Sequence, residues 1–209
     1  MSFTNLTGSL TTTTVQTFST AAFARLDSAE IRALHTDVIN VLNTAQINAL
    51  SATQLSYLTT AQAGALSTTS IGVLSTTQFL GLTATQLGAL DTNQLGGLTT
   101  VEMGTLTVTQ LGGLTTVEAV ALTTTQVSAL STVVIPLLST KLLNALGTTN
   151  IGALTTTQFV GLTATQLGAI TTTQLTGLTT VEVTALTATQ IKGLTTLQTA
   201  GLNTAQVGC

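Results

Sequence analysis

A leucine recurs at every eighth position of the chain from Leu26 to Leu202, with Ile170 as a conservative replacement. This spacing defines 23 consecutive octads, and a looser register extends back through Phe18 to Leu10. Self-similarity at a fixed period is typical of repeat architectures. The apolar pattern therefore predicts an array of repeats rather than a conventional globular domain.

Polar residues occupy fixed places between the leucines, and the common octad reads L-T-T-T-Q-h-G-A, where h is apolar. Counted from the leucine, position 2 is Ser, Thr, Asp or Asn in 21 of 23 octads, and position 5 is Gln or Glu in 18. Such a pair, three residues apart, is the signature of a capping box, which begins a helix. The leucine and the apolar position 6 have the spacing of a hydrophobic staple. Each octad is thus predicted to start its own helix.

The regular octads give specific expectations for caps and core. We expect capping boxes to join Thr83 with Gln86, Thr99 with Glu102, and Thr163 with Gln166. The leucine of each octad and the apolar side chain at its sixth position should stack into an apolar spine, represented by Leu82, Leu87, Leu162 and Leu167.

One continuous helix does not fit the repeat. Eight residues advance about 800° in a helix, so the leucine stripe would rotate by roughly 80° per octad. A helix confined to one octad is unstable alone and needs its neighbours. The predicted fold is therefore all-α: a solenoid-like superhelical array of very short capped helices, one per octad.

A β-solenoid with 16-residue coils is the alternative, because Thr, Val and Ile favour strands. It accounts for the many threonines. It does not explain why Gln or Glu follows a capping residue at a fixed distance, nor why position 2 accepts Asp and Asn, which are poor strand formers.

The array is expected to have three parts: a leader at residues 1–9, degenerate octads that form an N-terminal cap at 10–41, and the regular array at 42–209. A drifted segment at 130–145 departs most from the pattern and contains Pro136. It is either a local kink in the spine or a site of lateral contact. The candidates for that contact are Val133, Val134 and Ile135, the most apolar run of the segment.

Composition limits the function classes. Only 5% of the 209 residues are charged, the net charge is −3 and the mean hydropathy is +0.55. Four cations leave no basic patch for nucleic acid. Proteins that stay apart in solution usually carry about 25–35% charged surface residues, so this surface should be adhesive. Half of the charged and histidine side chains precede Leu42, as suits a solvated end cap.

The sequence does not indicate an enzyme. The carboxylates are dispersed, Glu102, Glu118 and Glu182 stand where Gln caps elsewhere, and one histidine, His35, argues against a metal or cofactor site. Cys209 is a possible intermolecular thiol. The longest apolar run is far shorter than the roughly 20 residues of a membrane span. The start of the chain lacks a secretory signal pattern, so we expect either a cell-surface or extracellular location reached by a non-Sec route, or the cytoplasm.

The pattern L-T-x-x-Q-h-x-x-L, carried from Leu26 to Cys209, resembles the leucine-threonine-glutamine octapeptide repeats of long, low-complexity bacterial proteins. The resemblance implies a surface-associated or secreted repeat scaffold and transfers no functional residue. The first functional hypothesis is a structural protein, a homopolymer that assembles into a filament, sheath or surface layer. The second is an adhesin stalk or spacer that binds another surface protein. Ice binding is a third, tied to the β-solenoid.

Overall fold

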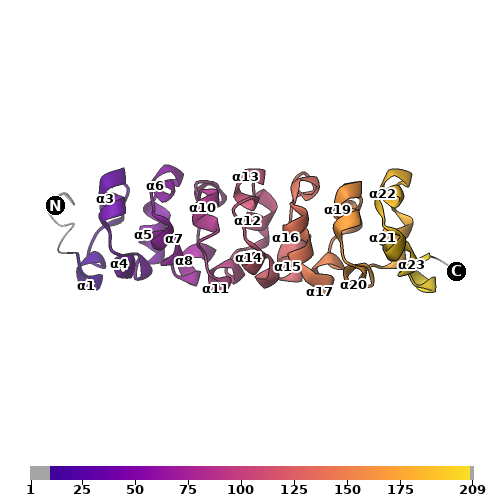
Figure 1. The fold of residues 1–209 in the computed structure, drawn as a ribbon. Helices are drawn as coiled ribbons and strands as arrows, with labels where there is room; N and C mark the ends of the chain where they lie inside the picture. Colours follow the sequence, from indigo (N-terminus) through magenta and orange to yellow (C-terminus); the bar gives the residue numbers. More distant parts are fainter. Residues whose placement is uncertain (1–9, 208–209) are drawn as a thin grey trace. The chain divides into compact units, whose positions relative to one another are not determined.

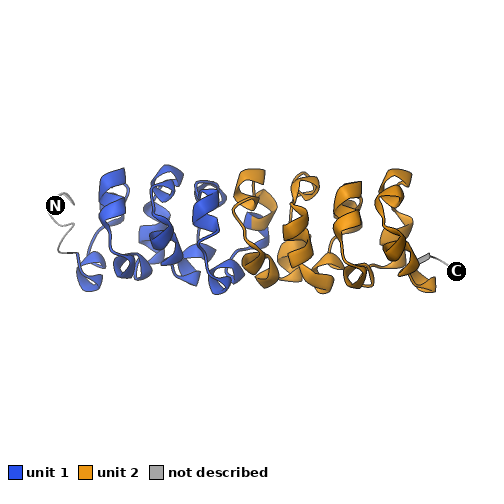
Figure 2. Ribbon diagram, in the orientation of Figure 1, with its two compact units in different colours: residues 1–102 blue, residues 103–209 orange. Residues whose placement is uncertain are grey.

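Short helices form one after another along the chain in the computed structural model, which describes residues 10–207 (Figure 1). The chain divides into two compact units, residues 1–102 and 103–209, and the boundary falls within α12 (Figure 2). Within the described range every regular element is helical and no strand is present. The predicted all-α array is confirmed, and the β-solenoid is excluded.

The α-helices are four to six residues long and fall one to an octad throughout the regular array. Unit 1 contains α1 (Thr12–Val15), α2 (Thr20–Phe23), α3 (Ser28–Ala33), α4 (Thr36–Asn40), α5 (Thr44–Ala49), α6 (Ala52–Ser56), α7 (Thr60–Gly64), α8 (Thr68–Gly72), α9 (Thr76–Leu80), α10 (Ala84–Leu87) and α11 (Thr92–Gly96); the boundary helix is α12 (Thr100–Thr105). Unit 2 contains α13 (Val108–Leu111), α14 (Thr116–Ala121), α15 (Thr124–Ser128), the 3₁₀ helix η2 (Ile135–Leu137), α16 (Thr140–Ala145), α17 (Gly147–Ile151), α18 (Thr156–Val160), α19 (Ala164–Ala169), α20 (Thr172–Leu175), α21 (Thr180–Thr184), α22 (Ala188–Gly193), α23 (Thr196–Ala200) and α24 (Thr204–Val207).

Within each unit, most of the helix pairs in contact are three octads apart. In unit 1, α6 contacts α9 and α7 contacts α10. In unit 2, α16 contacts α19 and α19 contacts α22, and these three helices follow one another in Figure 1. The equivalent first residues of α6 and α9, Ala52 and Thr76, are separated by three whole octads. Three octads therefore complete one turn of the solenoid, and each unit presents three rows of helices. The number of octads per turn was not apparent from the repeat itself.

The interior of each unit is built from the leucine of every octad and the apolar residue at position 6. Leu82, Leu87, Leu162 and Leu167 are at most 2% exposed. Phe79 and Phe159 occupy the same position 6 in their octads and are fully buried. Because an isolated helix of five residues is unstable in water, this burial between successive turns supplies the stability that local helix propensity cannot.

The two octads without a capping residue at position 2 begin their helices differently. His35 stands at the N-cap of α4 and makes no side-chain capping hydrogen bond. Gly147 begins α17 with φ of +72°, in the left-handed region where a side chain would be strained. Gly147 thus begins α17 without a side-chain cap, in a backbone conformation that glycine adopts without strain.

The drifted segment 130–145 keeps its place in the array but changes its helix. The octad that starts at Leu130 contains η2 in place of an α-helix, and Pro136 lies in its first turn. Proline supplies no backbone N–H and has a fixed φ, which suits a short helix start. The octad therefore departs from the regular helix without leaving the solenoid.

Candidate functional site

A reciprocal pair of hydrogen bonds begins most helices. The Thr83 hydroxyl accepts from the Gln86 backbone N–H at 3.2 Å, and the Gln86 Oε1 accepts from the Thr83 N–H at 2.7 Å. Thr163 and Gln166 repeat both contacts, at 3.2 and 2.7 Å. Thr99 and Glu102 are joined in the same way, at 3.4 and 2.7 Å. Each pair satisfies two of the four amides that a helix start leaves open.

The other end of the glutamine side chain bonds to the preceding turn of the solenoid. The Gln86 Nε2 donates to the carbonyl of Leu55 at 2.9 Å and to that of Leu58 at 2.6 Å, which lie 31 and 28 residues earlier. We call this arrangement of a capping oxygen and a doubly donating amide the glutamine clamp. Both carbonyls at these separations are also bonded by Gln46, Gln54, Gln62, Gln78, Gln94, Gln158, Gln166, Gln198 and Gln206.

The clamp links hydrogen bonding to burial. The Gln86 side chain is 2% exposed, and the leucine carbonyl that it bonds belongs to the spine. A buried backbone carbonyl without a donor costs free energy, so every turn of the solenoid depends on the glutamines of the next. The capping pattern in the sequence predicts only the first of these two roles. One signal pointed to it: a capping box accepts Gln or Glu, yet Gln fills 14 and Glu 4 of the 18 matching octads.

Glu102 carries a carboxylate at a clamp position. Its side chain is 2% exposed, and burial raises the pKa of its carboxyl, against the lowering effect of the hydrogen bonds with Thr99. By the register of the array, the carbonyls of Ile71 and Leu74 correspond to the two that a glutamine clamp bonds in the preceding turn. A carboxylate has no hydrogen to donate to a carbonyl, whereas the amide of Gln has two. Glu102 therefore caps α12 as a glutamine would, but its ionised carboxylate cannot donate the inter-turn hydrogen bonds of a glutamine clamp.

The run proposed for lateral contact does not lie on the surface as a whole. Val133 is 70% exposed, but Val134 and Ile135 are 4% and 0% exposed. The expectation that all three form a contact patch is therefore wrong. Val134 and Ile135 occupy positions 5 and 6 of their octad, and both positions are buried in the neighbouring octads as well.

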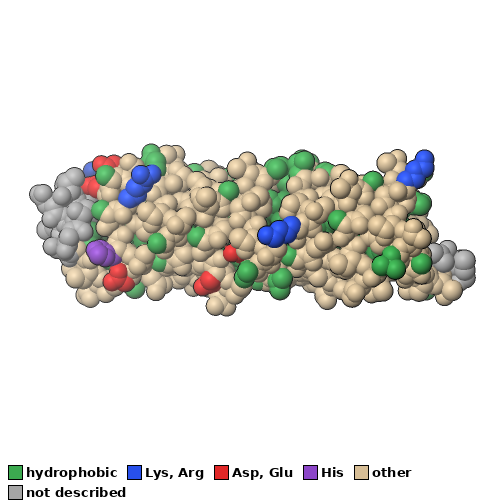
Figure 3. All heavy atoms as spheres, viewed as in Figure 1, with side chains coloured by type: hydrophobic (Ala, Val, Ile, Leu, Met, Phe, Trp, Pro, Cys, Tyr) green, Lys and Arg blue, Asp and Glu red, His purple; other side chains and the backbone are tan. Residues whose placement is uncertain are grey.

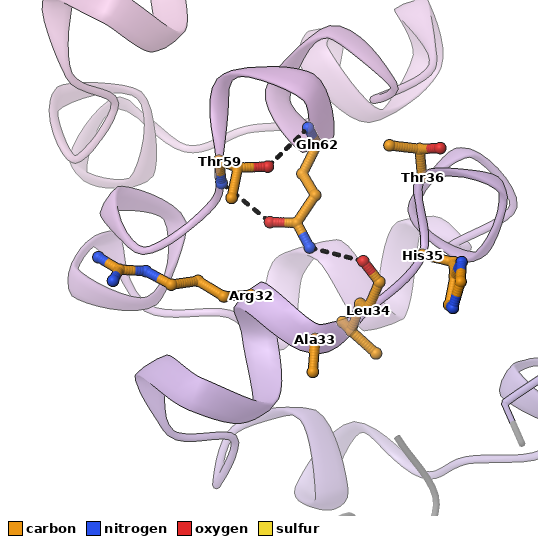
Figure 4. Close-up of a pocket in the computed structure, with 7 residues that line it drawn as sticks. All are labelled: Arg32, Ala33, Leu34, His35, Thr36, Thr59 and Gln62. Atoms are coloured by element: carbon orange, nitrogen blue, oxygen red, sulfur yellow. Dashed lines mark hydrogen bonds between the residues drawn. The ribbon is translucent and has the colours of Figure 1, made fainter. Parts of the chain in front are cut away.

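A pocket of about 320 Å³ in unit 1 lies around the clamp of Gln62, between α3 and α7 (Figure 4). The Gln62 Nε2 donates to the Leu34 carbonyl at 2.7 Å. Arg32 and His35 also line the pocket, but Figure 4 shows their side chains extending to opposite sides of the clamp. The pocket thus presents a structural hydrogen-bond system rather than converging acid, base and nucleophile.

Charged side chains are sparse on the face drawn in Figure 3, and those of unit 1 gather toward its N-terminal helices. Among the residues that the structure describes, no group of three or more His, Cys, Asp or Glu side chains is arranged to hold a metal ion. No helix of this part of the chain is long and apolar enough to cross a membrane. The leader at residues 1–9 and Cys209 lie outside the described residues.

A repeat family matches part of this array. The model of the ALTTAQ repeat matches residues 39–68, which span α5, α6 and α7. The match shows that this stretch is a threonine- and glutamine-rich repeat, and it includes the clamp residues Gln46, Gln54 and Gln62. No curated protein matches the chain.

Proposed function

We propose that this protein is a structural repeat protein that assembles with copies of itself into a filament, sheath or surface layer. The observation that carries the proposal is the low-charge surface of a regular solenoid. Only 5% of the chain is charged, while the side chains of Val101, Val117, Val133, Val181 and Leu197 are each more than 60% exposed. A surface with few charges and with exposed apolar side chains is poorly protected against association.

Regular geometry makes such a surface suitable for extended assembly. Because equivalent residues recur every three octads within a unit, a contact made by one turn has counterparts on the next. Repeated contacts add without requiring any single strong site, and a contact that does not close on itself produces a fibre. With so little charge, mutual repulsion between copies is weak. The resemblance to bacterial surface-associated repeats supports an extracellular or cell-surface location as part of this proposal.

An adhesin stalk or protein-binding spacer is the second candidate. It is favoured by the uneven distribution of charge, since Arg25, Asp27, Glu30, Arg32 and Asp37 lie within three neighbouring octads of unit 1. A charged segment beside a neutral array suits a scaffold that presents one distinctive region. The ice-binding hypothesis depended on threonine rows on strands and is not part of the proposal.

Sedimentation velocity and negative-stain microscopy over a concentration series test the first candidate. Assembly predicts a concentration-dependent increase in mass and regular particles. A monodisperse monomer at the highest concentration would contradict the proposal and favour the spacer. Added salt separates apolar association from ionic association, because screening weakens only the latter at moderate ionic strength.

A further inference from the structure

The three rows of helices in unit 2 differ in their exposed side chains. One row consists of α13, η2, α18, α21 and α24, and its four octads before α24 contain a single ionisable residue, Glu182, which is buried. The row of α14, α16, α19 and α22 carries Lys141 and Lys192. The row of α15, α17, α20 and α23 is also uncharged, and Leu197 is its only large exposed apolar side chain in the described range.

Exposed large apolar side chains are most numerous on the first of these rows, which we call the apolar row; the row of α14, α16, α19 and α22 has three, Val117, Val120 and Ile191. Those of the apolar row come from each of its first four helical segments and recur about one turn apart. They are Val108, Val133, Leu137, Val160 and Val181. The segments of the row are continuous. Helix α18 contacts α21, and Ile135 of η2 lies next to Gly161 at the end of α18, where a Cβ would be 3.7 Å from its Cγ2.

A pocket of about 220 Å³ opens on the same row, between α13, η2 and the start of α16. Val108 and Leu137, which are partly exposed, line it together with the buried Leu111, Leu114 and Leu142. Leu142 stands at position 5 of its octad, where a glutamine would by register reach the carbonyls of Leu111 and Leu114. The pocket therefore lies where a glutamine clamp is missing.

We propose that two copies of this chain associate through the apolar row, with Val133 of each copy entering the pocket of the other. This inference rests on the proposed function of self-assembly and names one of its contacts, the one that pairs two copies. Because a two-fold contact closes at the pair, growth of a filament or layer uses a second contact between pairs. Val133 is 70% exposed and projects from the segment that leads into η2, and the other end of η2 lines the pocket. A projection and a pocket on neighbouring parts of one surface are self-complementary under a two-fold axis, which is the geometry of an isologous dimer.

The charge distribution favours a second copy as the occupant. Burying the apolar row removes no exposed charge from water, provided that the surface opposite is equally uncharged. About a quarter of the residues of an average soluble protein are charged, against 5% of this chain. The same row on another copy is apolar and has no exposed charge on its first four octads, and it is present at equal concentration. The residues that contribute most to an interface lie in well-packed, desolvated pockets near its centre.

Matched variants test the inference by sedimentation velocity. Val133→Glu introduces a charge on the apolar row. Val117→Glu is the control, because Val117 also stands at position 4 of its octad and is 66% exposed, but lies on the row of Lys141. We expect Val133→Glu to weaken self-association about tenfold or more, as loss of a central interface residue does, and Val117→Glu to leave it near the unmodified value. Circular dichroism checks that both variants fold.

A second pair of variants probes the row independently. Gly112→Leu fills the pocket without touching Val133, and Val181→Glu alters the row one turn beyond α18. Both should weaken association. If the unmodified chain assembles and the variants on the apolar row associate as strongly as Val117→Glu, the inference is overturned while self-assembly stands. If the unmodified chain is a monomer throughout, both proposals fail.

Discussion

The side-chain amide of Gln86 donates to the backbone carbonyl of Leu58, 28 residues earlier, while its oxygen accepts from the N–H of Thr83 in its own octad. One side chain thus begins a helix and joins it to the turn before. The two functions differ in range: the first is local in sequence, and the second requires the solenoid to be formed. Their separate contributions to stability can be measured by substitution.

Gln86→Leu should destabilise the protein more than Thr83→Ala. The alanine variant loses one cap, which costs about 1 kcal/mol. The leucine variant removes the acceptor of a capping amide and leaves the carbonyls of Leu55 and Leu58 without this donor, so we expect about 2–4 kcal/mol. Denaturant unfolding gives the comparison, with hydrogen exchange to localise the loss. Equal costs for the two variants would show that the inter-turn bonds contribute nothing.

Close packing between turns should make Gly81 intolerant of a side chain. A Cβ at this position would lie 2.6 Å from the Cα of Ala52, a backbone atom of the preceding turn that cannot move alone. Gly81→Ala is expected to destabilise by about 1–3 kcal/mol through overpacking. Gly96→Ala is the control, since a Cβ there meets nothing within 4 Å. At that site alanine should stabilise by about 0.4–1 kcal/mol by restricting the unfolded chain. Thermal unfolding of both variants tests the opposite signs.

The local half of this fold was predictable from the residues alone. A capping box involves only four consecutive residues. The capping pairs Thr83–Gln86 and Thr163–Gln166 could therefore be predicted without knowing which residues lie nearby in space. The hydrogen-bond partners of Gln86 in the preceding turn could not be assigned, because the sequence of an octad does not indicate that three octads complete a turn. The excess of Gln over Glu at position 5 was the available signal, since only an amide both accepts from the cap and donates onward.

The error at Val134 and Ile135 has a related cause. Their apolar character suggested a surface patch, but the octad position decides burial: position 5 is buried throughout the regular array, and position 6 is buried in every octad from Leu42 to Leu175. Of the three residues, only Val133 is exposed, because it stands at position 4 of the octad. Register is therefore a better guide to exposure in this chain than hydrophobicity is.

Glu102→Gln should stabilise the protein at neutral pH. Burial raises the pKa of this carboxyl in the folded state, so the native protein holds the proton more tightly than the unfolded chain does. The stability from that proton is fully present below the unfolded-state pKa and is lost as pH rises through the folded-state pKa. The gain in free energy of unfolding from Glu102→Gln should therefore grow as the pH rises from the unfolded-state pKa to the folded-state pKa. It should vanish at lower pH, where the glutamate is protonated. Thermal unfolding across the acidic range measures it.

Glu30→Gln is the control for this pH dependence. Glu30 occupies the same octad position and accepts from the N–H of Asp27 at 3.0 Å, but it is only half-buried. The variant should change stability little over the same pH range. A neutral-pH gain at Glu30 as large as that at Glu102 would show that general loss of negative charge, and not the buried position, is responsible.

Asn150→Gln should restore a complete clamp. The Asn150 Nδ2 donates to the Leu122 carbonyl, 28 residues earlier, at 2.8 Å, and the side chain is one methylene shorter than Gln. By register, the carbonyl of Ala119 is the second acceptor that a full clamp would bond. A glutamine that reaches both carbonyls gains one buried hydrogen bond, worth about 0.5–1.5 kcal/mol net. Asn150→Leu, which removes the existing bond, should lower the denaturant midpoint. If Gln and Leu shift the midpoint in the same direction, hydrogen bonding to the earlier turn is not what position 5 contributes.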